Sequence, residues 1–150
     1  MSLKALDNLV KVGVLKEEPG NQKEFDGLVS SGRARLSDAR MKGLSPEGQF
    51  DLAYGAAHAF ALATLRWHGY RTNNQRFAVF QALEHTIGLR AQFWRVLAKC
   101  HSNRNLAEYA GKFEVDAQLI GDLISVATMV GEAVEKLGPV PKFRSSDGPR

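Results

Sequence analysis

The chain is poor in the residues that crosslink proteins or bind metal ions. Its 150 residues include one cysteine, Cys100, which excludes an internal disulfide framework and a cysteine-rich zinc module. Four histidines are present, but no Glu-x-x-His pair occurs, which argues against a carboxylate-bridged di-iron bundle. We therefore expect neither a metal ion nor another cofactor.

Long apolar runs and glycine-rich phosphate loops are also missing. No apolar run approaches the roughly 20 residues of a membrane-spanning helix. The N-terminal segment carries Asp7 and lacks the apolar core and cleavage site of a signal peptide. We expect a cytoplasmic protein that does not associate with a membrane. The absence of Walker, dinucleotide and Gly-x-Ser-x-Gly motifs argues against P-loop, Rossmann and α/β-hydrolase chemistry.

What is present is an ordinary globular composition with a small positive charge. Apolar residues make up 44% and charged residues 24%, and the formal net charge is +4. A single domain of this length buries about 68–70% of its unfolded surface, so it needs no crosslink for stability. A charge of +4 permits an acidic partner such as RNA but does not identify one.

Helical periodicity runs through almost the whole chain. Ser45-Pro46-Glu47 predicts a helix start, because Ser caps, Pro suits the first helical position and Glu meets the positive end of the dipole. Apolar residues at steps of three or four predict the other helices. The expected helices cover residues 2–15, 22–42, 45–68, a segment capped by Asn73 or Asn74 that ends before the break at Thr86-Ile87-Gly88, 89–100 and 114–137, with residues 101–109 either extending the fifth helix or opening a new one.

No Asn-Gly or Asp-Gly turn lies between alternating apolar runs, and no solenoid repeat occurs. We therefore expect an all-α fold, an antiparallel four-helix-type bundle with additional N-terminal helices. The bundle is expected over residues 46–137, after helical additions over residues 1–45 and before a flexible tail over residues 138–150.

One polar segment late in the chain carries the most chemistry. His101, Arg104, Asn105 and Glu108 are spaced to share one helix face, with Tyr109 one turn beyond Asn105. Such a set suits a phosphate, because Arg can clamp its oxygens and His or Tyr can pass protons. A solvated helix face with an Arg104–Glu108 ion pair is the alternative interpretation.

Two segments carry a resemblance to a known family. Tyr54-Gly-Ala-Ala-His-Ala-Phe-Ala-Leu62 resembles the alanine- and aromatic-rich first core helix of the HEPN superfamily (higher eukaryote and prokaryote nucleotide-binding domain). Arg104-Asn-Leu-Ala-Glu-Tyr109 resembles the late Arg-Asn-x-x-x-His or Arg-x-x-(Ala)-Asp-Tyr signature of the same family. His85 follows a helix where related chains often carry a histidine near a loop. Together these segments span about residues 46–135.

The resemblance implies a helical bundle, usually dimeric, with the Arg motifs of two subunits facing a shared cleft. Active members are metal-independent ribonucleases, often toxins encoded beside a small nucleotidyltransferase antitoxin. Carried over, Arg104 takes the position that acts on the scissile phosphate and Asn105 the adjacent polar position. Tyr109 stands where the family has His, and a phenol with a pKa of about 10 is a poor base at neutral pH. His101 is the imidazole that could substitute for it.

The resemblance therefore implies an RNA- or nucleotide-binding protein of the toxin–antitoxin or defence type, with metal-independent endoribonuclease activity. Its expected partners are a second copy of the chain, RNA or a nucleotide, and a nucleotidyltransferase-type antitoxin. A catalytically silent helical module for dimerisation or partner binding is the alternative, which Tyr109 favours. The expected catalytic residues are Arg104, Asn105, Tyr109 and His101, and the expected substrate-binding residues are Glu108, His85 and Arg90.

Other titratable and basic residues have weaker signals. Among a series of arginines in the middle of the chain, Arg71, Arg76 and Arg90 are candidates for RNA contact, with a solvated surface as the alternative. Cys100 is expected to be a buried, unreactive thiol, and His58 a buried, hydrogen-bonded side chain.

Overall fold

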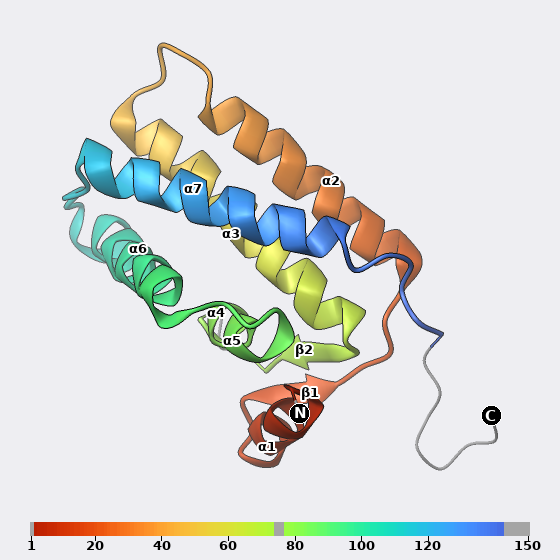
Figure 1. The fold of residues 1–150 in the computed structure, drawn as a ribbon. Coiled ribbons are helices and arrows are strands. Elements are labelled where there is room, and N and C mark those ends of the chain that lie inside the picture. Colours follow the sequence, from red (N-terminus) through yellow and green to blue (C-terminus); the bar gives the residue numbers. More distant parts are fainter. Residues whose placement is uncertain (1, 74–76, 143–150) are drawn as a thin grey trace.

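The structure, a computed structural model, describes residues 2–73 and 77–142. The fold is mostly helical, which confirms the all-α class, and the long helices lie along one another with the short elements gathered at one end (Figure 1). The elements are α1 (Ser2–Lys11), β1 (Leu15–Glu17), α2 (Gln22–Ala39), α3 (Pro46–Trp67), β2 (Tyr70–Thr72), α4 (Ala78–Gln81), α5 (Leu83–Thr86), α6 (Ala91–Ala110) and α7 (Ala117–Glu135).

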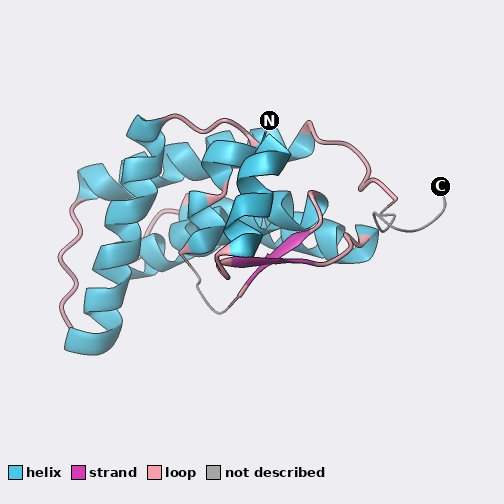
Figure 2. Ribbon diagram, turned by 90° about the horizontal axis from the view of Figure 1, so that it is seen from below, coloured by secondary structure: helices cyan, strands magenta, loops and turns pink. Residues whose placement is uncertain are grey.

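The described ranges also contain one two-stranded antiparallel sheet (Figure 2). β1 pairs with β2, so that Leu15 lies opposite Thr72. The predicted helix over residues 2–15 is therefore too long: α1 ends at Lys11, and Gly13, at a φ of +83°, turns the chain into the strand. Leu15 is buried in a small second core against α1 and the end of α3.

The start and end of α3 are those that the sequence predicts. The side chain of Ser45 accepts a hydrogen bond from the backbone N–H of Gly48 at 3.0 Å, and Pro46 stands at the first helical position. His68 is the C-cap residue, and Gly69 follows with a φ of +88°. This helix runs through the centre of the molecule and positions Tyr54 for the site described below.

The main core has α2 as a full member. Phe25, Val29 and Leu36 of α2 are buried in the same cluster as the apolar residues of α3 and α7. The core therefore extends to the N-terminal side of residue 46, where the sequence suggested that the bundle begins. Prediction missed this because α2 is polar over most of its surface and only a narrow stripe faces the core.

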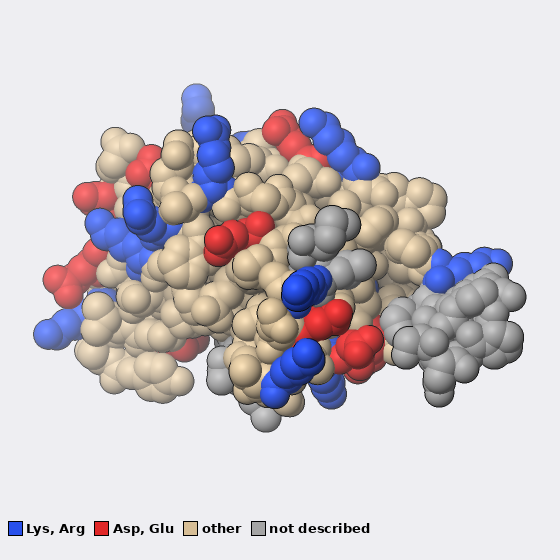
Figure 3. Space-filling model, turned by 60° about the horizontal axis from the view of Figure 1, so that its bottom comes forward, with Lys and Arg blue, Asp and Glu red and all other residues tan. Residues whose placement is uncertain are grey.

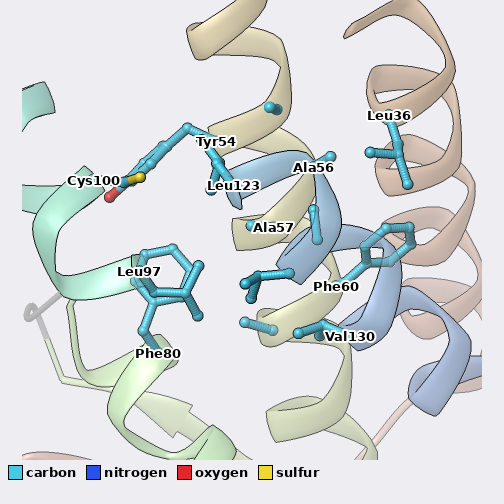
Figure 4. Packing of buried hydrophobic residues seen from close by; sticks show 14 of the residues in the cluster. Leu36, Tyr54, Ala56, Ala57, Phe60, Phe80, Leu97, Cys100, Leu123 and Val130 are labelled. Carbon is cyan, nitrogen blue, oxygen red and sulfur yellow. The ribbon is translucent and has the colours of Figure 1, made fainter. Parts of the chain in front are cut away.

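Phe60 of α3 fills the space between three helices and points toward α2 in Figure 4. A Cβ atom on Gly32 of α2 would lie 2.5 Å from one ring carbon of Phe60, and a Cβ on Gly131 of α7 would lie 2.8 Å from another. Both distances are shorter than carbon atoms tolerate. The two glycines therefore allow α2 and α7 to approach the ring closely.

The segment between β2 and α6 differs from its prediction. Two short helices, α4 and α5, stand in place of one longer helix, and Phe77 occupies the N-cap position of α4 without a side-chain hydrogen bond. Asn73 does not cap, because its amide donates to the carbonyl oxygen of Gly13 at 3.3 Å; Asn74 lies outside the described residues. Beyond this segment α6 continues unbroken to Ala110, so residues 101–109 extend the preceding helix.

Part of the predicted tail is held against the bundle. The indole of Trp67 donates to the carbonyl oxygen of Gly138 at 3.2 Å, and the backbone N–H of Val140 donates to the side-chain oxygen of Gln22 at 2.7 Å. Val140 also packs against the main core. Residues 143–150 of the predicted tail lie outside the described residues.

α7 begins at an N-cap, Asp116, whose carboxylate accepts from the N–H of Leu119 at 2.8 Å. By length and composition alone α7 could cross a membrane, a test that core helices of soluble proteins also pass. Leu123, Ala127 and Val130 bury its apolar face in the main core, which is the role of a core helix.

Candidate functional site

Arg104 lies on the side of α6 that faces α3. Its Nη1 atom is 3.6 Å from the carboxylate of Asp51, and its Nη2 atom is 3.5 Å from that of Glu108. The guanidinium also lies over the ring of Tyr54, 4.9 Å from the ring centroid. Only 26% of the Arg104 side chain is exposed, so its position is fixed by contacts on several sides.

Tyr54 connects Arg104 to His101. The Tyr54 hydroxyl is 3.0 Å from Nδ1 of His101, and the amide nitrogen of Asn105 is 3.4 Å from Nε2 of the same imidazole. In the tautomer that accepts a hydrogen bond from Asn105, Nδ1 carries the proton and donates to Tyr54. The ring of Phe77 lies 4.7 Å from the imidazole, centroid to centroid, and covers part of it. His101 is therefore oriented by groups from three segments.

Tyr109 lies apart from this cluster. It follows Arg104 by five positions, which turns the two side chains about 140° apart around the helix axis. Its side chain is 86% exposed and lines a shallow hollow on the outer face of α6 with Leu106. Asn105 borders both the hollow and the His101 imidazole. The structure thus groups His101, Arg104, Asn105 and Glu108, and separates the phenol from the guanidinium.

Two other residues predicted to bind substrate lie away from Arg104. Arg90 is the N-cap residue of α6, which places it about 21 Å from Arg104 along the helix axis. Its guanidinium lies over the ring of Phe93 at 5.7 Å. His85 lies in the short helix α5 and is half-buried. Neither residue lines the cleft that opens beside Arg104, which is described next.

A cleft of about 450 Å³ opens beside Arg104, between α2, α3 and α6. This volume lies within the range of about 300–1,000 Å³ that is typical of small-molecule sites. Polar groups from all three helices line it. The lining residues are Leu28, Ser31, Arg35, Asp51, Leu52, Tyr54, Gly55, His58, Ala59 and Arg104.

Arg35 is a cleft residue that sequence reasoning missed. It lies on α2, which the sequence suggested was an addition to the bundle, and its side chain reaches across to α3. A Cβ on Gly55 would lie 2.8 Å from Nη1 of Arg35, so the arginine lies against the bare backbone of α3. Gly55 was the available signal, because a glycine within an alanine-rich helix costs about 1 kcal/mol relative to Ala and leaves room for a close approach.

A second cluster of charges has a structural role. Arg66 is buried, with a side chain that is 2% exposed, and it donates to the Glu24 carboxylate at 2.9 Å and to three backbone carbonyl oxygens. Arg71 donates to Glu18 and to Glu24, both at 2.7 Å. These contacts join the ends of α2 and α3 to the sheet. Arg71 is therefore committed to carboxylates, and Arg76, the other arginine considered for RNA contact, lies outside the described residues.

The carboxylates of this cluster are more acidic than usual. The hydrogen bond from Arg71 holds the pKa of Glu18 below its ordinary value. Burial alone would raise the pKa of Glu24, but the hydrogen bonds from Arg71 and Arg66 outweigh burial, and the pKa is lowered. The hydrogen bond that Arg71 donates to Glu24 raises the pKa of Arg71 in turn.

Cys100 is fully buried, as predicted, and burial raises the pKa of its thiol to about 12. Among residues 2–73 and 77–142, no three His, Cys, Asp or Glu side chains are grouped so that they could hold a metal ion. The polar groups that line the cleft are guanidinium, imidazole, phenol, hydroxyl and carboxylate groups. Comparison of the chain with protein-family models, with curated proteins and with solved structures found no match.

Proposed function

We propose that the chain is a HEPN-like protein that binds RNA or a nucleotide through a phosphate in the cleft beside Arg104. The observation that carries the proposal is that the Arg104 guanidinium is held in one orientation but forms no short hydrogen bond with a carboxylate. It is held over Tyr54, but its distances to Asp51 and Glu108, 3.6 and 3.5 Å, exceed the 2.7–2.9 Å of a charge-assisted hydrogen bond. The fork is oriented without being fully used by either carboxylate.

A phosphate can take the place of these carboxylates. The side chains of Asp51 and Glu108 are 59% and 45% exposed, so both can turn toward water when an anion enters. Phosphate oxygens match the planar fork of arginine in two parallel hydrogen bonds. Lys and Arg are interspersed with Asp and Glu on the face that Figure 3 presents. The proposal rests on the local geometry of Arg104.

Metal-independent RNA cleavage, as in a toxin or defence nuclease, extends the same proposal. Arg104 would hold the scissile phosphate, and His101, one turn away, would transfer protons. The contact between Tyr54 and His101 supports this role, because it fixes the imidazole beside the guanidinium. The contact of Asn105 with the other ring nitrogen is long, at 3.4 Å, and it has to open before that nitrogen exchanges a proton with the substrate. Tyr109 has no part in this arrangement, because its side chain points away from Arg104.

The test compares two arginines of α6. Labelled single-stranded RNA is titrated with the wild type, with Arg104→Ala and with Arg95→Ala, and binding is followed by fluorescence anisotropy. Arg95 is exposed on the same helix and does not line the cleft, so its variant removes the same charge elsewhere. We expect Arg104→Ala to weaken binding at least about tenfold, since a hydrogen bond to a charged group contributes about 1.5–3 kcal/mol. Equal affinities for the two variants, or no binding by the wild type, would overturn the proposal.

Cleavage is tested separately. RNA is incubated with the wild type and with His101→Gln in the presence of EDTA, after RNA binding by both proteins has been measured. Cleavage by the wild type alone supports a role for His101. Binding without cleavage keeps the binding function and removes the nuclease.

A catalytically silent module that pairs with itself is the second candidate. The observation that favours it is the outer face of α6, where Tyr109 is 86% exposed and Leu106 is 43% exposed. Exposed aromatic and aliphatic groups beside one another are typical of contact surfaces. A dimer by light scattering that Tyr109→Lys converts to a monomer supports this candidate. A wild type that is monomeric and retains no nucleotidyltransferase-type partner contradicts it.

A further inference from the structure

The position of Arg35 carries an inference about the ligand. Arg35 comes from α2 and Arg104 from α6, so the cleft receives one guanidinium from each side of α3. Gly55 makes this possible, because a Cβ there would meet Nη1 of Arg35 at 2.8 Å and its Cδ at 3.3 Å. The side chain therefore lies along the α3 backbone beside the cleft.

Arg35 forms no ion pair among the residues that the structure describes, although Asp51 lines the same cleft. Within the described ranges, no carboxylate oxygen lies within 4.0 Å of its guanidinium. Ser31, one turn earlier on α2, adds a hydroxyl group to the same wall of the cleft. A permanent cation and a hydroxyl group that face a second cation across a cleft form a site for an anion with several oxygens.

We propose that Arg35 and Arg104 together clamp a phosphomonoester, the terminal phosphate of an RNA strand or of a free mononucleotide. This inference rests on the proposed function and narrows it. A phosphomonoester carries a charge of about −1.5 to −2 at neutral pH, and an internal phosphodiester carries a single negative charge. Two guanidinium groups therefore match the charge of the phosphomonoester better.

The size and the lining of the cleft also favour a small phosphomonoester over an internal stretch of RNA. About 450 Å³ suits one small molecule and not a run of nucleotides. Proteins that bind strands internally offer several aromatic rings on which successive bases stack. Here the aromatic side chains of the lining are Tyr54 and His58, and the Arg104 guanidinium covers the Tyr54 ring.

Asp51 competes with the ligand for Arg104. Its Oδ1 atom is 3.6 Å from Nη1 of Arg104, so it occupies one side of the fork. An incoming phosphate must displace it. Asp51→Asn keeps the size of the side chain and removes the competing charge, so this variant binds the phosphomonoester several-fold more tightly than the wild type.

The experiment uses matched oligonucleotides and the full chain. One RNA sequence is prepared with a 5′-phosphate, with a 3′-phosphate and with hydroxyl groups at both ends, and adenosine monophosphate is compared with adenosine. We expect a phosphorylated end to increase affinity at least tenfold. Arg35→Ala removes this increase, and Gly55→Ala reduces it, because the added methyl group displaces Arg35 without changing charge. Arg95→Ala keeps it, and circular dichroism verifies that each variant is folded.

The outcomes separate this inference from the proposed function. If all three RNAs bind equally and Arg104→Ala weakens each of them, the proposed function stands and the terminal-phosphate clamp is wrong. If a phosphorylated end increases affinity and Arg35→Ala leaves the increase intact, the clamp is also wrong. If RNA binding does not depend on Arg104 at all, the proposed function itself fails. Binding of adenosine monophosphate as tight as that of phosphorylated RNA identifies the mononucleotide as sufficient, whereas tighter binding of one RNA identifies the strand end.

Discussion

The guanidinium of Arg104 lies 4.9 Å from the centroid of the Tyr54 ring, in a cation–π contact between α6 and α3. The hydroxyl of the same tyrosine is hydrogen-bonded to His101 at 3.0 Å. One buried residue therefore positions a permanent cation with its ring and an imidazole with its hydroxyl. Cation–π contacts contribute about 0.5–2 kcal/mol, which is enough to hold a largely covered arginine in one orientation.

Substitution of Tyr54 separates these two contacts. Tyr54→Phe keeps the ring below Arg104, so RNA affinity should stay within about twofold of the wild type. The lost hydroxyl leaves a half-buried imidazole nitrogen without its partner, and the free energy of unfolding should fall by about 1–2 kcal/mol. Tyr54→Leu removes the ring as well and should also weaken RNA binding. Urea denaturation and anisotropy measure the two effects; full RNA affinity in Tyr54→Leu would show that the ring does not orient Arg104.

The packing of Phe60 against Gly32 predicts that a glycine-to-alanine substitution has opposite effects on stability at Gly32 and at Gly27. Gly32→Ala places a methyl group 2.5 Å from a ring carbon of Phe60, and overpacking of this kind costs about 1–3 kcal/mol. Gly27→Ala, on the same helix, meets nothing within 4 Å and should stabilise the protein by about 0.5–1 kcal/mol, the gain in helix propensity. Thermal or urea unfolding of the two variants tests this. Similar changes in both would mean that Phe60 does not lie against Gly32.

The charge cluster at the ends of α2 and α3 predicts a loss of stability in acid. Arg71 and Arg66 lower the pKa of Glu24 in the folded protein below its ordinary value of 4.5, so the unfolded chain binds more protons as the pH falls. The stabilisation is therefore complete above pH 4.5 and is lost as the pH falls through the lowered pKa.

Glu24→Gln tests the source of this pH dependence. The variant should be less stable than the wild type at neutral pH, because it leaves the buried Arg66 with a weaker partner. Its free energy of unfolding should then change less with pH in the acidic range than that of the wild type. Urea titrations at a series of pH values measure both slopes. Parallel curves for the two proteins would exclude Glu24 as a source of the acid sensitivity.

Cys100 should be unreactive in the folded protein. Its side chain is fully buried, and a pKa of about 12 leaves almost no thiolate at mildly alkaline pH. A chromogenic disulfide reagent should therefore label the native protein slowly and the urea-unfolded protein at the rate of a free thiol. Rapid labelling of the native protein would mean that α6 opens readily at this position.

The parts of the fold that follow from local chemistry were predictable. Ser45 and Pro46 define the start of α3, and Gly69 marks its end, because capping and left-handed backbone involve neighbouring residues only. The pairing of Leu15 with Thr72 was not predictable, because it joins short segments far apart in the chain that carry no turn signal. Asn73 is a residue type that often caps helices, but its side-chain amide donates a tertiary hydrogen bond to the carbonyl oxygen of Gly13 instead.

The same division applies to the site. His101, Arg104 and Asn105 come together because one helix carries them at suitable spacing, which sequence can show. Tyr109 is only five residues from Arg104 in sequence, yet the helical turn separates their side chains. Arg35 lines the cleft because α2 packs on α3. The one sequence feature that hints at this contact is Gly55, a glycine within an alanine-rich helix.

The most direct test of the cleft as a phosphate site uses the unmodified protein. Arginine Nε–Hε resonances are followed by NMR at mildly acidic pH while adenosine monophosphate or 5′-phosphorylated RNA is added. We predict saturable shifts for Arg35 and Arg104, the two arginines that line the cleft, and none for Arg95 on the outer face of α6. Unchanged Arg35 and Arg104 resonances at saturating ligand, or shifts confined to arginines outside the cleft, would contradict the account.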